Sequence, residues 1–149
     1  MTNKDCIKAS ISLHSQGEML LTSWGYTNKL PSDNELLLSI GNAAAAAIKK
    51  VNGRDYTVGP AGAVLYPAGG ASDDFAKGTA GVTFAVTVEL PGGGGRQVSY
   101  SGIFYRNGGR TNSFPACSNP WGLDRSKIKG VGEEMWEASK VFASEAKKL

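Results

Sequence analysis

The chain is organised around the stretch Ile11-Ser12-Leu13-His14-Ser15-Gln16-Gly17-Glu18-Met19-Leu20-Leu21-Thr22-Ser23-Trp24-Gly25-Tyr26, which contains its only histidine. From Ile7 to Leu13, apolar residues alternate with Lys and Ser, the period-two pattern of a strand with one apolar face. His14 follows the last apolar position and is expected where this strand passes into a loop. Ligands of open α/β sheets bind just outside the carboxyl ends of the strands. On the residues alone, His14 is either part of such a site or a strand-end histidine that only makes a hydrogen bond.

The length, charge and cysteines of the chain limit the classes of fold and partner. Its 149 residues suit one domain with a core of its own. The net charge of +3 is small and scattered, so no nucleic-acid partner is expected. No apolar run approaches the roughly 20 residues of a membrane span, and the first residues lack the apolar core of a signal peptide. Cys6 and Cys117 are too far apart for a local metal knuckle, and they either pair or stay free.

Two long helices are predicted, one before and one after the glycine-rich parts of the chain. Apolar residues recur at helical spacing over Asp33–Val51, and the pair Asn52-Gly53 ends this run. Ser32 and Glu35 have the spacing of a capping box at its start. Small residues from 43 to 47 would let this helix lie close to a sheet. The second helix is predicted over Val131–Ala146.

A second strand is predicted over Val82–Leu90, where apolar and other residues alternate. One side would carry Val82, Phe84, Val86, Val88 and Leu90. Glu89 lies near the exit of this strand, as His14 lies near the exit of the first. Long helical crossovers between the two strands favour parallel neighbours in one sheet, with both exits at the same edge. The expected fold class is therefore α/β, with a partial mixed or parallel sheet flanked by helices.

The remaining segments are less regular. Arg54–Ala71 is rich in glycine and proline, and Ala63–Tyr66 within it is predicted to be a short strand or an extended loop. Ser72 is expected to cap the helical turn that follows. Arg96–Pro120 has no continuous apolar face, so this segment is predicted to be poorly ordered. It is expected to be either a lineage-specific loop or translated non-coding sequence.

Several motifs occur together in a fixed order. The first is Leu13-His14-Ser15 with Gln16-Gly17-Glu18-Met19-Leu20-Leu21 and Trp24-Gly25-Tyr26-Thr27 behind it. The others are Tyr56-Thr57-Val58-Gly59-Pro60, Leu65-Tyr66-Pro67-Ala68-Gly69-Gly70-Ala71-Ser72-Asp73-Asp74-Phe75, Phe84-Ala85-Val86-Thr87-Val88-Glu89-Leu90 and Gly132-Glu133-Glu134-Met135-Trp136-Glu137-Ala138. With these motifs the chain resembles the zinc carboxypeptidases of the pancreatic and insect digestive type. The resemblance implies the C-terminal half of a catalytic domain across residues 1–149, with a non-matching insertion at 96–120.

The resemblance also implies roles for single residues. His14 would be a zinc ligand, and Glu89 the general base that accepts a proton from the attacking water. Tyr66 matches the mobile tyrosine that covers bound substrate, and Ser15 falls at a substrate-binding position. Gln16 departs from the family, which usually has a tyrosine there.

Asp73 has two possible roles. By the resemblance it lies at the base of the pocket for the terminal side chain of the substrate. An acidic residue there implies a preference for Lys or Arg, because a desolvated charge needs a partner of opposite sign. The competing interpretation is that Asp73 only favours the first turn of its own helix.

Part of the expected catalytic machinery is missing from this sequence. The family supplies two further zinc ligands from an upstream His-x-x-Glu motif, and the chain has no such motif. A catalytic zinc normally takes three protein ligands, so the isolated chain is expected to be inactive. The resemblance implies a zinc metallocarboxypeptidase that acts on peptide or protein C-termini, outside the cell. The alternative is a non-catalytic binding or interaction module that keeps part of the fold.

Overall fold

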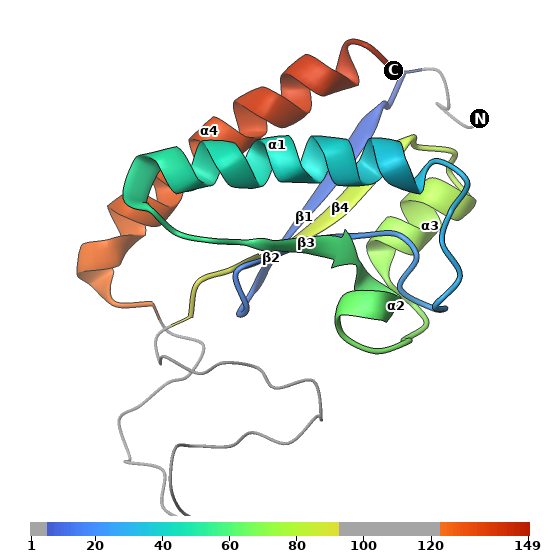
Figure 1. The fold of residues 1–149 in the computed structure, drawn as a ribbon, viewed down its shortest axis with the longest axis horizontal. Helices are drawn as coiled ribbons and strands as arrows, with labels where there is room; N and C mark the ends of the chain where they lie inside the picture. Colours follow the sequence, from blue (N-terminus) through green and yellow to red (C-terminus); the bar gives the residue numbers. More distant parts are fainter. Residues whose placement is uncertain (1–5, 93–122) are drawn as a thin grey trace, which may run out of the picture.

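In the computed structural model, which describes residues 6–92 and 123–149, the strands form one mixed sheet (Figure 1). It has four strands in the order β1-β4-β2-β3. Their bounds are Ala9–Ser15 for β1, Met19–Thr22 for β2, Thr57–Pro60 for β3 and Phe84–Leu90 for β4. β1 and β4 are parallel neighbours, as predicted, whereas β2 runs antiparallel to β4. The α/β class with a mixed sheet is confirmed.

Two long helices and several short ones complete the described fold. Their bounds are Asn34–Asn52 for α1, Ala61–Val64 for α2, Ser72–Gly78 for α3 and Ile128–Ala146 for α4, and a 3-10 turn at Arg125–Lys127 precedes α4. Both predicted long helices are present at nearly the expected positions. None of the helices in the described ranges combines the length and the hydropathy that a membrane crossing requires.

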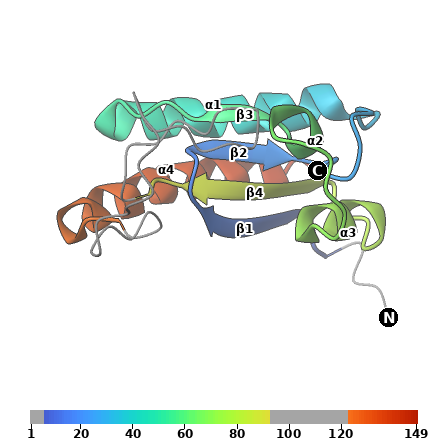
Figure 2. The same ribbon diagram turned by 90° about the horizontal axis from the view of Figure 1, so that it is seen from below.

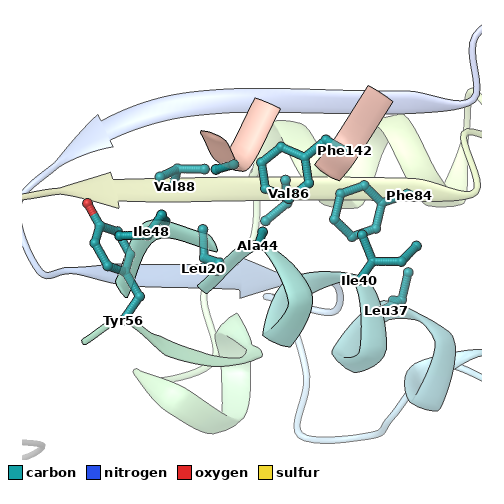
Figure 3. Close-up of a cluster of buried hydrophobic side chains, with 11 residues drawn as sticks. Leu20, Leu37, Ile40, Ala44, Ile48, Tyr56, Phe84, Val86, Val88 and Phe142 are labelled. Atoms are coloured by element: carbon teal, nitrogen blue, oxygen red, sulfur yellow. The ribbon is translucent and has the colours of Figure 1, made fainter. Parts of the chain in front are cut away.

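α1 and α4 lie together on one face of the sheet and enclose the main core (Figures 1 and 2). The rings of Phe84 and Phe142 are 5.4 Å apart and join β4 to α4 (Figure 3). The buried residues of this core are Leu20, Leu37, Ile40, Ala44, Ile48, Tyr56, Phe84, Val86, Val88, Ala138 and Phe142. Phe84, Val86 and Val88 share this side of β4, which confirms the predicted alternation of the strand.

Small residues bring α1 close to the sheet. A Cβ added to Gly41 would lie 2.5 Å from Cγ1 of Val58, closer than such atoms approach one another. Ala44, one turn further on, is fully buried. α1 ends at Gly53, whose φ of 73° is a left-handed conformation that glycine adopts at little cost. The expected close packing and the expected helix end are both observed.

The opposite face of the sheet carries a smaller cluster under α3. Ala76 of α3 packs with Ala85 of β4 and with Val82. The prediction that Val82 shares the side of Phe84 is therefore wrong. Val82 precedes the first residue of β4, so the alternation of the strand does not extend to it.

β1 forms one edge of the sheet, and most of its apolar side chains are exposed. The register places Ile11 beside Val86 and Leu13 beside Val88, on the side of the main core. Ile11 is nevertheless 42% exposed and Leu13 58% exposed, whereas Ala9 packs against the core. The apolar face predicted for this strand exists, but the described residues cover only its first part.

Two predicted helix caps are wrong. α1 begins at Asn34 with Asp33 at the capping position, and no side chain caps it. The Asp33 carboxylate instead accepts a hydrogen bond of 2.7 Å from Lys77. α3 begins at Ser72, so Ala71 occupies the capping position and has no side-chain oxygen to offer.

Of the two alternatives predicted for Ala63–Tyr66, the short strand is wrong, and Tyr66 lies in a loop. Ala61–Val64 forms a single helical turn, α2, directly after β3. The buried N–H of Gly62 donates to the carbonyl of Trp24 at 3.0 Å, and a side chain on Gly62 would collide with the backbone of Thr27. This close approach of two backbones favours the turn. The segment Arg96–Pro120, predicted to be poorly ordered, lies outside the described residues.

Candidate metal and catalytic site

His14 and Glu89 lie side by side at the carboxyl ends of β1 and β4. The parallel register pairs them directly, and their side chains share the face opposite the main core. Nδ1 of His14 is 3.9 Å from Oε1 of Glu89. The His14 side chain is 57% exposed and that of Glu89 is 15% exposed. His14 and Glu89 were predicted only to lie at the same edge of the sheet, and the structure places their side chains next to one another.

The environment of Glu89 raises the pKa of its carboxyl. Burial raises the pKa of this carboxyl, and the nearby charge of His14 lowers it by a smaller amount. A carboxylate with a raised pKa is a stronger base than an exposed one and is better suited to accept a proton near neutral pH. The exposed imidazole beside it remains open to a ligand from solvent.

Asp73 is buried in α3 on the same face of the sheet. Its side chain is only 3% exposed, and Oδ2 has no hydrogen-bond partner among the described residues. Burial raises the pKa of Asp73, and the charge of Asp74 adds to this, whereas backbone N–H groups and the charge of His14 lower it. The charge of His14 thus lowers the pKa of Asp73 as it does that of Glu89, in each case by less than burial raises it. It does not occupy the capping position of α3.

Asp74 has a positioning role that the sequence analysis missed. Its carboxylate accepts hydrogen bonds from the backbone N–H of Gly25 at 2.9 Å and of Tyr26 at 2.9 Å. These bonds tie the loop after β2 to the first turn of α3. The neighbouring residues Asp73 and Asp74 were the only sign in the sequence of two separate carboxylate roles. Nothing in the sequence identified the loop that Asp74 binds.

Ser15 and Tyr66 have fewer described contacts with the other proposed site residues. Ser15 is the last residue of β1 and is exposed. Tyr66 lies in the loop after α2, and its side chain is 66% exposed. Within the described residues no hydrogen bond joins Tyr66 to His14, Asp73 or Glu89. The substrate-binding roles implied for Ser15 and Tyr66 stay predictions.

The described residues do not by themselves fit a catalytic zinc. No three His, Cys, Asp or Glu side chains in residues 6–92 and 123–149 gather closely enough to hold a metal ion. A catalytic zinc needs three protein ligands with one position left for water. The exposed imidazole of His14 can supply one of these ligands. Any complete site needs donors from elsewhere.

Comparison with known proteins identifies the family. The sequence profile of the zinc carboxypeptidases matches residues 1–138. The chain belongs to the zinc carboxypeptidase family. The fold agrees, since the carboxypeptidase A structure from Helicoverpa armigera superposes on 96% of this chain with a TM-score of 0.73 and 32% identity.

The matched relatives are considerably longer than this chain. Carboxypeptidase B of Astacus astacus is 38% identical over 93% of this chain, and the match covers 38% of the relative. Human carboxypeptidase O is 36% identical over 60% of this chain, and the match covers 24% of that protein. The Helicoverpa armigera structure is covered to 31%. The matched parts thus cover between about a quarter and two fifths of these proteins.

Proposed function

We propose that this chain supplies part of the catalytic domain of a metallocarboxypeptidase, an enzyme that removes C-terminal residues from peptides. The observation that carries the proposal is the His14–Glu89 pair, with 3.9 Å between Nδ1 and Oε1, in a member of the zinc carboxypeptidase family. In this role His14 is one ligand of the metal and Glu89 is the general base. The substrate is the C-terminus of a peptide or protein, and the proposed location is extracellular.

The chemistry proposed for this chain is proton transfer at Glu89. A bound zinc ion would lower the pKa of water to near neutrality. In the proposed role, Glu89 would accept a proton from the attacking water and pass it to the leaving amine. Burial supports this role because it raises the pKa of Glu89. The imidazole of His14, 3.9 Å from Oε1 of Glu89, would hold the metal beside this base.

The other zinc ligands are proposed to come from chain outside these 149 residues. Two observations support this. The described residues hold no three-membered metal-ligand group, and the matched relatives are more than twice as long as the match. β1 is also an edge strand of the described sheet, so its backbone could pair with a further strand, and Ile11 and Leu13 are largely exposed. A binding module without catalysis is the alternative, and the lone imidazole favours it for the isolated chain.

Asp73 is proposed to set a preference for terminal Lys or Arg. Its carboxylate is buried, is not used as a helix cap, and has one oxygen without a partner among the described residues. A substrate cation would compensate this buried charge, which a neutral side chain would leave unpaired. The roles of Ser15 and Tyr66 as substrate-binding residues rest on the family resemblance.

The proposed base is tested in a joined protein, in which this chain follows an upstream half that carries His-x-x-Glu from a zinc carboxypeptidase relative. We expect Glu89→Gln to lower kcat for release of a terminal residue by about 10²–10⁴-fold, the usual contribution of a general base, with zinc content unchanged. Glu133→Gln is the matched control, because Glu133 is an exposed carboxylate on α4 that makes only a 3.8 Å contact with Lys129. If the folded, zinc-loaded Glu89→Gln protein keeps the parent rate, Glu89 is not the base.

A further inference from the structure

A buried carboxylate in α4 anchors an ion-pair network that reaches toward the site. The side chain of Glu134 is 0% exposed. Nε of Arg54 donates to both Glu134 oxygens at 3.1 Å, and Nδ2 of Asn52 donates to Oε1 at 3.0 Å. A buried carboxylate that is fully paired in this way holds its partners in one geometry. Glu134 therefore fixes the position of the Arg54 guanidinium.

Arg54 continues the network to the turn between β1 and β2. Its Nη1 lies 3.1 Å from Oε1 of Glu18, and the side chains of both residues are only partly exposed. Burial alone would lower the pKa of Arg54, but the hydrogen bond to Glu134 and the charges of Glu134 and Glu18 raise it overall. The guanidinium stays charged and bridges two carboxylates, which its planar fork of N–H donors allows.

Glu18 has a backbone conformation that requires such an anchor. Its φ is +50°, in the left-handed region that few non-glycine residues occupy. Its carbonyl accepts a hydrogen bond of 2.9 Å from the N–H of Thr57, at the start of β3. A residue in an unfavourable conformation persists only when its surroundings hold it there. Arg54 holds the side chain of Glu18, and β3 holds its backbone.

The turn that Glu18 completes also touches the base. The N–H of Gly17 donates to the carbonyl of Leu90 at 3.2 Å. A Cβ on Gly17 would lie 3.5 Å from Cβ of Glu89, so the turn packs against that residue. Met19, directly after Glu18, pairs with Glu89 across the sheet. The turn that leads out of His14 and Ser15 therefore rests on the same strand end as Glu89.

We propose that Arg54 is a positioning residue, and that Glu134, Arg54 and Glu18 form a clamp that fixes the turn 16–18 and so sets how His14 and Glu89 face one another. The clamp acts through the turn, because none of its members is a proposed metal ligand or base. Its consequence for turnover rests on the proposed function. Its effect on the geometry of the turn does not.

The test uses the 149-residue chain and two spectroscopic readouts. His14 is the only histidine, so its imidazole signals in NMR spectra are identified without ambiguity. The amide of Gly17 reports on the turn through hydrogen exchange, because it is bonded to Leu90. We expect Glu18→Ala to speed exchange at Gly17 by about tenfold, as for local opening of a released turn, and to shift the His14 signals. Exchange at Ile48, inside α1, should stay unchanged.

A second variant approaches the clamp from the other side. Arg54→Lys keeps a positive charge beside the buried Glu134, but a single ammonium cannot bridge both carboxylates with the same geometry. It should change the Gly17 and His14 readouts in the same direction as Glu18→Ala. If one of the two variants does not fold, the other decides the outcome.

Asp55→Asn is the matched control. It removes an ion pair of 2.7 Å with Lys49 at the same end of α1, and that pair has no link to the turn. The clamp is wrong if folded Glu18→Ala or Arg54→Lys protein keeps the parent signals at Gly17 and His14, or if Asp55→Asn changes them equally. Neither readout involves zinc or hydrolysis, so failure of the clamp and failure of the proposed function are separate results.

Discussion

At the level of single residues, two carboxyls in the same region have raised pKa values but different surroundings. Burial raises the pKa of Glu89 and of Asp73, and the charge of His14 lowers both. Glu89 has the imidazole of His14 within 3.9 Å and a partly open side chain. Oδ2 of Asp73 is buried with no partner among the described residues. Glu89 is thus placed to exchange a proton, whereas an ionised Asp73 costs stability until a cation reaches it.

Asp73→Asn should therefore stabilise the chain at neutral pH. An acid whose pKa is higher in the folded state binds its proton more tightly there. Protonated Asp73 therefore contributes its full stabilisation below the unfolded pKa of about 3.9, and this contribution is lost as pH rises through the raised folded pKa. Asparagine carries no charge to desolvate. Thermal unfolding should show a higher Tm than the parent at pH 7, and a smaller difference near pH 3. A lower Tm at pH 7 would show that the carboxylate has a partner that we have not identified.

At the level of elements, alternation and helical spacing were sufficient to predict β1, β4, α1 and α4. Alternating residues in β1 and β4 predicted one sheet with both exits at the same edge, and the register confirms it. The predicted caps Ser32 and Ser72 were each misplaced by one residue, since α1 starts one residue later and α3 one residue earlier than expected. α2 was missed because its turn depends on the approach of another backbone at Gly62. Side-chain spacing within a segment carries no information on such long-range partners.

The close packing of α1 leads to a paired prediction on two helical glycines. Alanine favours helix over glycine by about 1 kcal/mol, so Gly132→Ala in α4, where a Cβ meets nothing within 4 Å, should stabilise by about 0.5–1 kcal/mol. Gly41→Ala should instead destabilise by about 1–3 kcal/mol, because the new methyl overlaps Val58. Urea unfolding measures both. Equal stabilisation by the two substitutions would show that α1 does not pack on β3 as described.

At the level of the whole molecule, we propose that this chain supplies only part of the metal site. The motifs in the sequence were sufficient to predict the family, and the strand pattern predicted that His14 and Glu89 lie at one edge of the sheet. Their direct pairing depends on the register of β1 and β4, which the sequence pattern did not specify. The clamp of Glu18, Arg54 and Glu134 was not predicted, because its members are far apart in sequence. The positions of Tyr66 and Asp73 relative to a bound substrate remain predictions.

The central claim is that His14 is one ligand of a zinc site completed by another stretch of chain. The most direct test is a calorimetric zinc titration of the joined protein described above, of its His14→Ala variant, and of the 149-residue chain alone. We expect one tightly bound zinc in the joined protein. We expect none in His14→Ala and none in the chain alone, because one imidazole supplies one of the three protein bonds that the site needs. Tight, stoichiometric zinc binding by the chain alone, or by the joined protein without His14, would contradict this account.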